Sequence, residues 1–256
     1  MAAVWTAVGE QAGGGAWYAI VVALPLAFLA LLLFLVLLAA SRQRRYRVAA
    51  GFGDDDRAAV RAALAAAERR TVGEILPVVV ERSDPHPGAE WLAALVLVLL
   101  GSSALLAWMP WQHPVVVLAL QLLFGGLGFG LARLLPDFKR RFVLERRADE
   151  VSREQAFQEF YANGLHRTTA ATGVLIFVSL FERRVVILAD EGIDAVVDAS
   201  FWADTDDRVL DGIRRGSLRD GLIAGIARAG ELLAARFPWT EGDRNEIPDR
   251  LIVRRE

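Results

Sequence analysis

The sequence predicts one α/β domain whose chain is interrupted by two membrane-spanning helices and preceded by a third. The interruption consists of two uncharged runs, Trp91–Trp108 and Val115–Ala132, separated only by a short loop. A third uncharged run covers Ala16–Ala40. Each is near the roughly 20 residues that an α-helix needs to cross a hydrocarbon core. The rest suffices for one ordinary domain. Buried core helices of a larger soluble protein are the alternative explanation of these runs.

The distribution of basic residues predicts the orientation of these spans. Arginines follow the first and third runs, whereas the N-terminal tail and the inter-helix loop contain no Lys or Arg. The positive-inside rule then places the N-terminus outside and the main domain in the cytoplasm, in the inner (plasma) membrane. A cleaved secretory signal is the alternative, but the segment before Ala16 lacks the positive charge that such signals carry.

The predicted organisation follows directly from these spans. A short extracytoplasmic tail (1–15) precedes the first span (16–40). The first cytoplasmic part of the domain (41–90), a transmembrane hairpin (91–135) and the main cytoplasmic part (136–256) follow.

The first soluble segment predicts a helix followed by a strand. Asp54, Asp55 and Asp56 open a helix that runs to about Arg70, because acidic side chains favour the positive end of the helix dipole. The β-rich run Ile75–Val80 follows, and its Pro77 predicts an edge or bulged position since proline cannot donate to a sheet ladder.

After the third span the pattern predicts a helix and a β-hairpin. The helix runs from about Leu144 to Asn163 and ends at Gly164, which favours a left-handed conformation. Two apolar runs separated by a short polar loop, Val174–Leu180 and Val185–Ala189, predict the hairpin.

Two further helices are predicted before a turn-rich tail. The first covers Asp204–Arg215, and the second begins at a capping segment, Ser217–Asp220. The second helix carries one apolar stripe, at Leu222, Ile226, Ala229, Leu233 and Phe237. Its three glycines predict close packing against the sheet, because glycine weakens an isolated helix.

Composition excludes several classes of function. A net charge of −2 disfavours a nucleic-acid partner, and the absence of cysteine excludes thiolate catalysis and cysteine-ligated zinc. His86, His113 and His166 lie far apart without metal-ligand spacing. Ser83 and Ser179 have no nearby His–acid arrangement in the sequence that supports a nucleophile.

Connection lengths predict that Glu74 and Asp190 meet at the end of the sheet farthest from the bilayer. The stretch from Ala189 to Gly212 is strongly acidic and contains a single basic residue, Arg208. Carboxylates that converge there could hold Ca²⁺ or Mg²⁺, which prefer oxygen ligands. The predicted metal ligands are Glu74, Asp190, Glu191 and Asp194. The alternative is that these acids are solvated surface, with Asp204 capping a helix.

Three segments in order resemble the TPM domain family, in its bacterial membrane-protein branch. They are the helix-to-strand segment Thr71–Val80, the hairpin Gly173–Gly192 and a tail containing Phe237-Pro238 and Asn245–Asp249. The resemblance implies a small βαβ-type sandwich of helices around a mixed sheet. It also implies either the phosphatase-like activity with divalent cations suggested for some members, or the membrane-associated accessory role of others.

Together these observations favour a membrane-anchored accessory or interaction module with a divalent-cation-binding acidic face. The alternative is a divalent-metal-dependent phosphatase acting on phosphoesters through Glu74 and Asp190, helped by Asp194. Expected partners are the lipid bilayer and a membrane protein. A second copy of the chain could pack through Gly126 and Gly130 of span three, although packing on span two within the chain is favoured.

Overall fold

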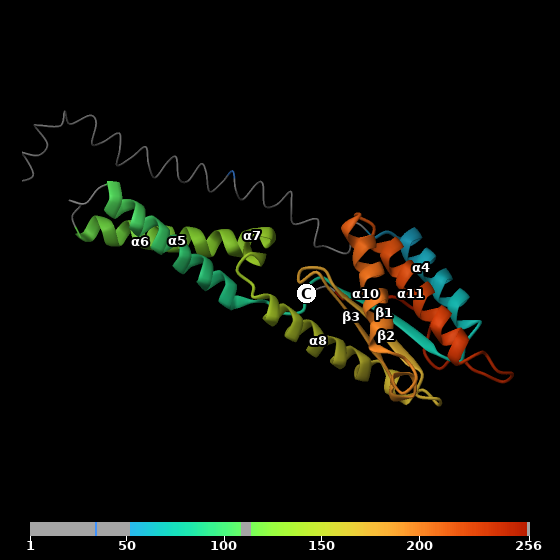
Figure 1. Cartoon of the computed structure of the whole chain (residues 1–256). Coiled ribbons are helices and arrows are strands. Elements are labelled where there is room, and N and C mark those ends of the chain that lie inside the picture. The colour runs from blue at the N-terminus through green and yellow to red at the C-terminus, as the bar shows by residue number, and fades with distance from the viewer. Residues whose placement is uncertain (1–33, 35–51, 109–113, 255–256) are drawn as a thin grey trace, which may run out of the picture. The chain divides into compact units, whose positions relative to one another are not determined.

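A four-stranded mixed sheet with helices on both faces forms the α/β unit of the chain (Figure 1). The computed structural model describes residues 34, 52–108 and 114–254. The described elements of the α/β unit are α4 (Asp54–Glu68), β1 (Glu74–Val80), α8 (Glu145–Ala162), the 3₁₀ turn η2 (Leu165–Arg167), β2 (Gly173–Ser179), β3 (Arg184–Ala189), α9 (Glu191–Asp194), α10 (Ala199–Arg214), α11 (Leu218–Arg236) and β4 (Ile252–Arg254). A separate helical unit contains α5 (Pro87–Trp108), α6 (Pro114–Leu134) and most of α7 (Pro136–Arg140).

The sheet has the order β3-β2-β1-β4. β1 runs parallel to β2 and β4, whereas β3 runs antiparallel to β2, so the predicted mixed sheet and hairpin are confirmed. β1 is not an edge strand, as Pro77 had suggested, but β4 pairs only with Val78–Val80. Pro77 therefore lies in the part of β1 that β4 does not reach, where a missing N–H costs little.

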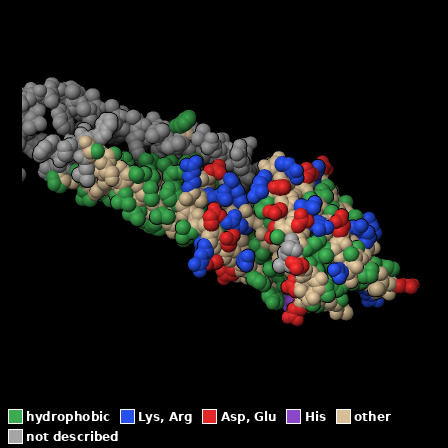
Figure 2. Space-filling model, in the orientation of Figure 1, with side chains coloured by type: hydrophobic (Ala, Val, Ile, Leu, Met, Phe, Trp, Pro, Cys, Tyr) green, Lys and Arg blue, Asp and Glu red, His purple; other side chains and the backbone are tan. Residues whose placement is uncertain are grey.

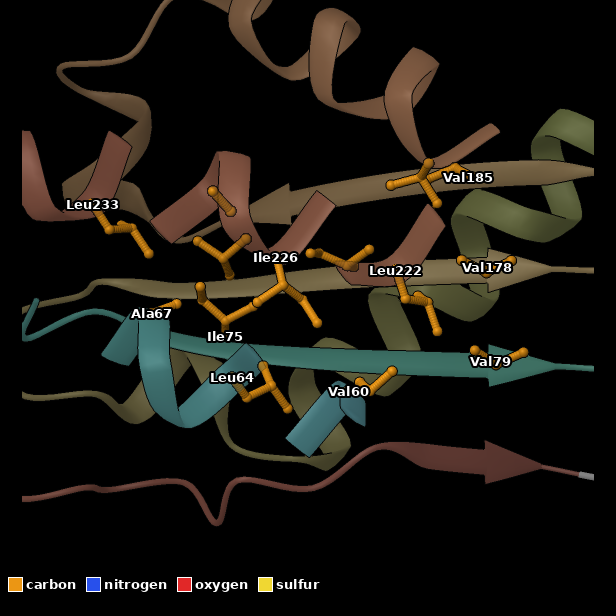
Figure 3. Close-up of a cluster of buried hydrophobic side chains, with 14 of the residues drawn as sticks. Val60, Leu64, Ala67, Ile75, Val79, Val178, Val185, Leu222, Ile226 and Leu233 are labelled. Carbon is orange, nitrogen blue, oxygen red and sulfur yellow. The ribbon is translucent and has the colours of Figure 1, made fainter. Parts of the chain in front are cut away.

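One face of the sheet packs against α4, α10 and α11 (Figure 3). Side chains of alternate strand residues, including Ile75, Val79 and Val178, meet the apolar stripe of α11. The predicted stripe residues Leu222, Ile226, Ala229 and Leu233 are all fully buried. Their burial shows that tertiary packing stabilises this helix despite its glycines.

The opposite face of the sheet packs against α8 and η2. Leu76 and Val78 of β1 and Phe177 of β2 contact Phe160 of α8 and Leu165 of η2 in this second core. Gly164, between α8 and η2, has a φ of 77°, which confirms the left-handed helix end.

The glycines of α11 permit close packing mainly against neighbouring helices, and only Gly225 among them also meets the sheet, at the side chain of Ile176. A Cβ on Gly221 would lie 2.6 Å from the carbonyl oxygen of Val209 in α10. A Cβ on Gly230 would lie 2.7 Å from the Cβ of Ala67 in α4. Gly225 likewise lies against the side chain of Val209.

Helix α10 begins at Ala199, earlier than the sequence indicates. Asp204 therefore lies inside the helix and does not cap it. Its Oδ2 accepts hydrogen bonds from Arg208 and Arg228, each at 3.0 Å. The helix starts earlier because the apolar and aromatic residues before Asp204 pack into the fold, an interaction that a local pattern does not reveal.

Helices α5 and α6 are each long and apolar enough to cross a membrane. The qualifying segments, Pro87–Leu105 and Val117–Leu134, have mean hydropathies of 1.8 and 1.7. Only 28% and 11% of these segments are buried inside the structure, whereas core helices of a soluble protein would be mostly buried. On the face shown in Figure 2, hydrophobic side chains predominate on the described part of this unit, whereas Lys, Arg, Asp and Glu are frequent on the α/β unit among other side chains. The predicted tail and first span, residues 1–40, lie outside the described residues apart from Phe34.

The two apolar helices contact each other within the chain, as favoured, through Gly101 of α5 and Gly128 of α6. A Cβ on Gly128 would lie 2.6 Å from the carbonyl oxygen of Ala93, and Gly101 lies against the ring of Phe124. Among the described atoms, none lies within 4 Å of a Cβ placed on Gly126 or Gly130. The favoured packing within the chain is therefore present, but Gly126 and Gly130 do not form it.

Candidate functional site

The structure brings Glu74 and Asp190 to the same end of the sheet, as predicted. Glu74 begins β1 and lies opposite Gly173 of β2 in the parallel ladder. Asp190 follows β3 and donates its backbone N–H to the carbonyl of Gly173 at 2.9 Å. Residues opposite one another in a ladder share a face of the sheet, so both acidic side chains begin on the α8 face with Gly173 between them.

The two carboxylates do not converge, because another segment lies between them. Two interstrand spacings separate their strands, about 10 Å. A Cβ on Gly173 would lie 2.4 Å from the carbonyl oxygen of Leu165, so the turn η2 covers this position. Within residues 52–108 and 114–254, no group of three or more His, Asp or Glu side chains is arranged to hold a metal ion. The predicted four-ligand metal site stays a prediction.

Glu74 is instead held by the C-terminal tail. Its Oε1 accepts the backbone N–H of Glu246 at 2.8 Å, and the carboxylate of Glu246 accepts hydrogen bonds from Thr169. Burial raises the pKa of Glu74 to about 6. Hydrogen bonds from the backbone N–H groups of Glu246 and Ile247 lower this pKa but do not cancel the effect of burial. The tail segment that resembled the TPM domain thus closes over the start of β1.

Glu68, which the sequence reasoning missed, is a second acid beside Glu74 and is partly buried. Its Oε1 accepts the backbone N–H of Ile75 at 3.0 Å, at the side of β1 that β4 leaves unpaired. Burial raises the pKa of Glu68 to about 9, although the Ile75 N–H lowers it, and Asp249 and Glu74 raise it further. Neither the spacing of Glu68 nor its helical position signals this environment, because the neighbours come from the C-terminal tail.

Asp190 is the most confined of the acids on the β3 side. It caps the short helix α9, where its Oδ1 accepts the backbone N–H of Glu191 at 3.0 Å, as aspartate commonly does at a helix start. The residue is only 9% exposed. Its Oδ2 is buried and has no hydrogen-bond partner in the described part of the chain.

Asp190, Glu191 and Asp194 line one cavity of about 500 Å³. Its lining comes from α8, η2, the loop before β2, β3, α9 and α10, and consists of Phe157, Phe160, Tyr161, His166, Ala171, Ile187, Leu188, Ala189, Asp190, Glu191, Asp194 and Trp202. Glu74 is not among these residues. Burial raises the pKa of Asp194, and the charge of Asp190 raises it further. The cavity therefore combines three predicted ligands, and no described Lys or Arg contributes to its lining.

The cavity lining also contains aromatic side chains, which the sequence reasoning did not identify. Phe157 and Tyr161 lie one turn apart on α8 and are both exposed. The Tyr161 ring lies 4.9 Å from the His166 ring, measured between centroids. The one signal in the sequence was this i, i+4 aromatic pair on an otherwise charged helix.

The other acids of the acidic stretch lie outside the cavity. Asp204 and Asp211 pair with arginines on the surface of α10 and α11, as solvated side chains do. Burial raises the pKa of Asp206 to about 7, with Asp207 adding to the rise and Arg153 opposing it. Asp204 and Asp211 are therefore solvated surface residues, which was the alternative to a metal site for this acidic stretch.

The opposite end of the sheet holds a different acidic group, built around Glu182. Its Oε1 lies 2.7 Å from Nε2 of His86, its Oε2 accepts the hydroxyl hydrogen of Ser179, and both oxygens accept the backbone N–H of Ser83. Burial raises the pKa of Glu182, but hydrogen bonds with His86, Ser179 and Ser83 outweigh burial and lower it.

A His–acid arrangement therefore does lie beside Ser179, contrary to the expectation from sequence. The residues involved are almost a hundred positions apart in the chain, so spacing did not reveal it. Ser179 is fully buried and bonds Glu182 rather than the histidine, which is not the geometry of an activated nucleophile.

Comparisons with known proteins agree with the fold. Residues 137–232 match the model of the TPM domain. The chain is also similar to the NMR structure of the BA42 protein from the psychrophilic bacterium Bizionia argentinensis, with 20% identity, a TM-score of 0.50, and coverage of 79% of this chain and 94% of that chain. No curated protein matches the sequence. The resemblance is thus confirmed for residues 137–232, which include the acidic cavity.

Proposed function

We propose that this chain is a membrane-anchored accessory module whose acidic cavity binds a divalent cation, Ca²⁺ or Mg²⁺. The observation that supports this most directly is Asp190, which is 9% exposed and leaves Oδ2 without a partner among the described residues. A buried carboxylate oxygen without a hydrogen bond is costly, and a bound cation would remove that cost.

The cavity has the chemistry that a hard cation requires. Glu191 and Asp194 add carboxylate oxygens from the first turn of α9, and the site is accessible through a cavity of about 500 Å³. Backbone carbonyls and water complete the coordination of such ions in many proteins. The proposed ligands are Asp190, Glu191 and Asp194, without Glu74, because η2 separates Glu74 from the cavity. These three carboxylates are not arranged around an ion in the described structure, so their side chains would have to rotate together when a cation binds.

Calorimetric titration of the full chain in detergent with CaCl₂ or MgCl₂ tests the cation site. Asp190→Asn should weaken binding at least about tenfold, the effect of losing about 1.4 kcal/mol. Asparagine caps helices as well as aspartate does, so this variant should keep α9. Asp211→Asn, on the exposed surface of α10, is the matched control and should bind as the wild type does. No binding to the wild type at millimolar metal would refute the proposal.

The geometry supports an accessory role better than the alternative phosphatase. A phosphatase that used Glu74 and Asp190 together would need both carboxylates at one reacting group, and η2 lies between them. We expect no metal-dependent hydrolysis of p-nitrophenyl phosphate. Turnover that Glu74→Gln or Asp190→Asn abolishes would instead establish the phosphatase.

The membrane part of the proposal rests on α5 and α6, whose length and composition suit a bilayer. We propose an inner-membrane protein with its N-terminus outside and its α/β unit in the cytoplasm, from the arginines that flank the apolar runs. Cytoplasmic and periplasmic reporters fused after Glu256 test the orientation. Only the cytoplasmic reporter should be active, and an active periplasmic reporter would reverse the orientation.

A further inference from the structure

We infer that the acidic cavity is the docking site for an extended segment of a partner protein, and that an arginine side chain of this segment enters the cavity. The inference deepens the proposed accessory role, on which it rests, by naming the chemistry of the partner.

The position of the cavity at a sheet edge favours an extended partner. β3 is the terminal strand of the described sheet, and Ile187, Leu188 and Ala189 of this strand line the cavity. Because Asp190 directs its N–H to β2, strand alternation directs the backbone groups of Ala189 and Ile187 away from β2. An added strand could therefore pair with them, which is the usual way in which a sheet edge recognises a peptide.

The lining of the cavity favours a cation with a flat, partly apolar surface. The lining includes Asp190, Glu191 and Asp194, and no Lys or Arg lines it among the described residues. The lining also includes Phe157 and Tyr161, which are exposed on α8. A guanidinium group can form charge-assisted hydrogen bonds with carboxylates while stacking on aromatic rings, whereas an ammonium group cannot stack in this way.

Asp190 supplies the strongest reason for a bound cation at this position. Its side chain is nine-tenths buried, and Oδ1 is already used by the cap of α9. Oδ2 has no partner in the part of the structure that is described. Glu191 and Asp194 line the same cavity as Asp190, so a cationic ligand would relieve repulsion between their carboxylates. The divalent cation of the proposed function and the arginine then compete for the same carboxylates.

Fluorescence anisotropy with the full chain in detergent tests this inference. The probe is a labelled peptide, acetyl-Gly-Val-Arg-Val-Gly-amide, and the matched peptide carries citrulline, which has the shape of arginine without its charge. The arginine peptide should bind at least tenfold more tightly than the citrulline peptide, and CaCl₂ should displace it. Asp190→Asn and Tyr161→Ala should each weaken binding at least about threefold. Asp211→Asn and Trp239→Ala, an exposed acid and an exposed aromatic outside the cavity, should not.

Two further peptides test pairing with β3. One is methylated at the arginine amide and the other at both valine amides, so each loses central N–H donors from a different one of the two alternate sets. Only one set faces the sheet edge in a paired strand, so one of the two peptides should lose binding and the other should keep it. Equal binding of both would refute strand pairing at β3.

The outcomes separate this inference from the proposed function. Binding of Ca²⁺ but of neither peptide overturns the docking site and leaves the metal site standing. Peptide binding without metal binding overturns the metal site and leaves the docking site standing. Equal binding of the arginine and citrulline peptides, or a lysine peptide that binds more tightly, overturns arginine as the ligand. Dimerisation of the chain that Asp190→Asn abolishes, in place of peptide binding, would assign the cavity to a second copy.

Discussion

The two ends of the sheet hold buried carboxylates in opposite states. At the end where β1 and β2 finish, Glu182 is 1% exposed and its two oxygens accept hydrogen bonds from His86, Ser179 and Ser83. At the other end, Glu74 and Asp190 are similarly buried, yet each leaves one oxygen without a partner among the described residues. The pKa of Glu182 is lowered, whereas the pKa of Glu74 is raised to about 6.

The difference shows which carboxylates stabilise the fold and which remain available to a ligand. A fully satisfied network holds the segment before α5 against the turn between β2 and β3, and it offers no free oxygen to bind anything. An unsatisfied buried oxygen destabilises the unliganded protein, and such an oxygen is retained where contact with a bound ligand offsets that destabilisation. The Glu182 end therefore has a structural role, and the unsatisfied oxygen at the Asp190 end is the feature on which our proposal of ligand binding rests.

The largest effect should come from Glu182→Gln. An amide cannot accept hydrogen bonds from Ser179, Ser83 and His86 at both of its ends, so buried partners lose their bonds. We expect a loss of about 3 kcal/mol in the free energy of unfolding, measured by urea denaturation of the full chain in detergent. Asp190→Asn, which also replaces a buried acid, should change the free energy of unfolding by less than about 1 kcal/mol. Equal losses of unfolding free energy in the two variants would show that the carboxylates at the two ends of the sheet do not differ in their contribution to stability.

Gly173→Ala should have the next largest effect, because it tests the contact that separates Glu74 from Asp190. A Cβ there would lie 2.4 Å from the Leu165 carbonyl oxygen, so the backbone of η2 must move. The expected loss is about 2 kcal/mol of unfolding free energy, typical of overpacking. Gly88→Ala, where an added Cβ meets no described atom within 4 Å, is the control and should be nearly neutral. A neutral Gly173→Ala would show that η2 does not hold the acids apart.

Glu68→Gln should produce a smaller, pH-dependent effect. The folded pKa of Glu68 is raised to about 9 from its ordinary value of 4.5, so the unfolded chain releases this proton first. The contribution of Glu68 to stability is therefore full below about pH 4.5 and is lost as the pH rises towards 9.

Glutamine keeps the acceptor for Ile75 and cannot ionise. We expect Glu68→Gln to be more stable than the wild type at pH 9 by at least about 1 kcal/mol, since even a tenfold change in proton affinity corresponds to about 1.4 kcal/mol. Urea denaturation at several pH values measures this. Parallel stability curves for the two proteins between pH 6 and 9 would contradict the raised pKa.

Arg184→Gln should have the smallest effect, although it removes two ion pairs near the Glu182 end. Arg184 pairs with Glu145 and Asp149, whose side chains are exposed. Exposed pairs contribute little, so we expect a loss below about 1 kcal/mol in urea denaturation. A loss as large as that of Glu182→Gln would show that charge pairing, rather than burial, sets the stability of this end.

Local patterns were sufficient for most elements of the α/β unit. The Ser217 cap, the left-handed Gly164 and the apolar stripe of α11 were all predicted correctly, because each depends on residues within a few positions of one another. The β2–β3 hairpin was predicted for the same reason. The short helix α9 and the strand β4 were missed, since elements this short carry no periodic signal.

The sequence by itself determined the alternation of helices and strands, the two apolar helices and the placement of Glu74 and Asp190 at one end of the sheet. Only the tertiary structure decided that η2 separates these two acids, that aromatic residues of α8 line one cavity with the acids of α9, and that His86 bonds Glu182. The physical reason is distance along the chain. Periodicity and capping act over a few residues, whereas each of these contacts joins segments that only the packed core brings together.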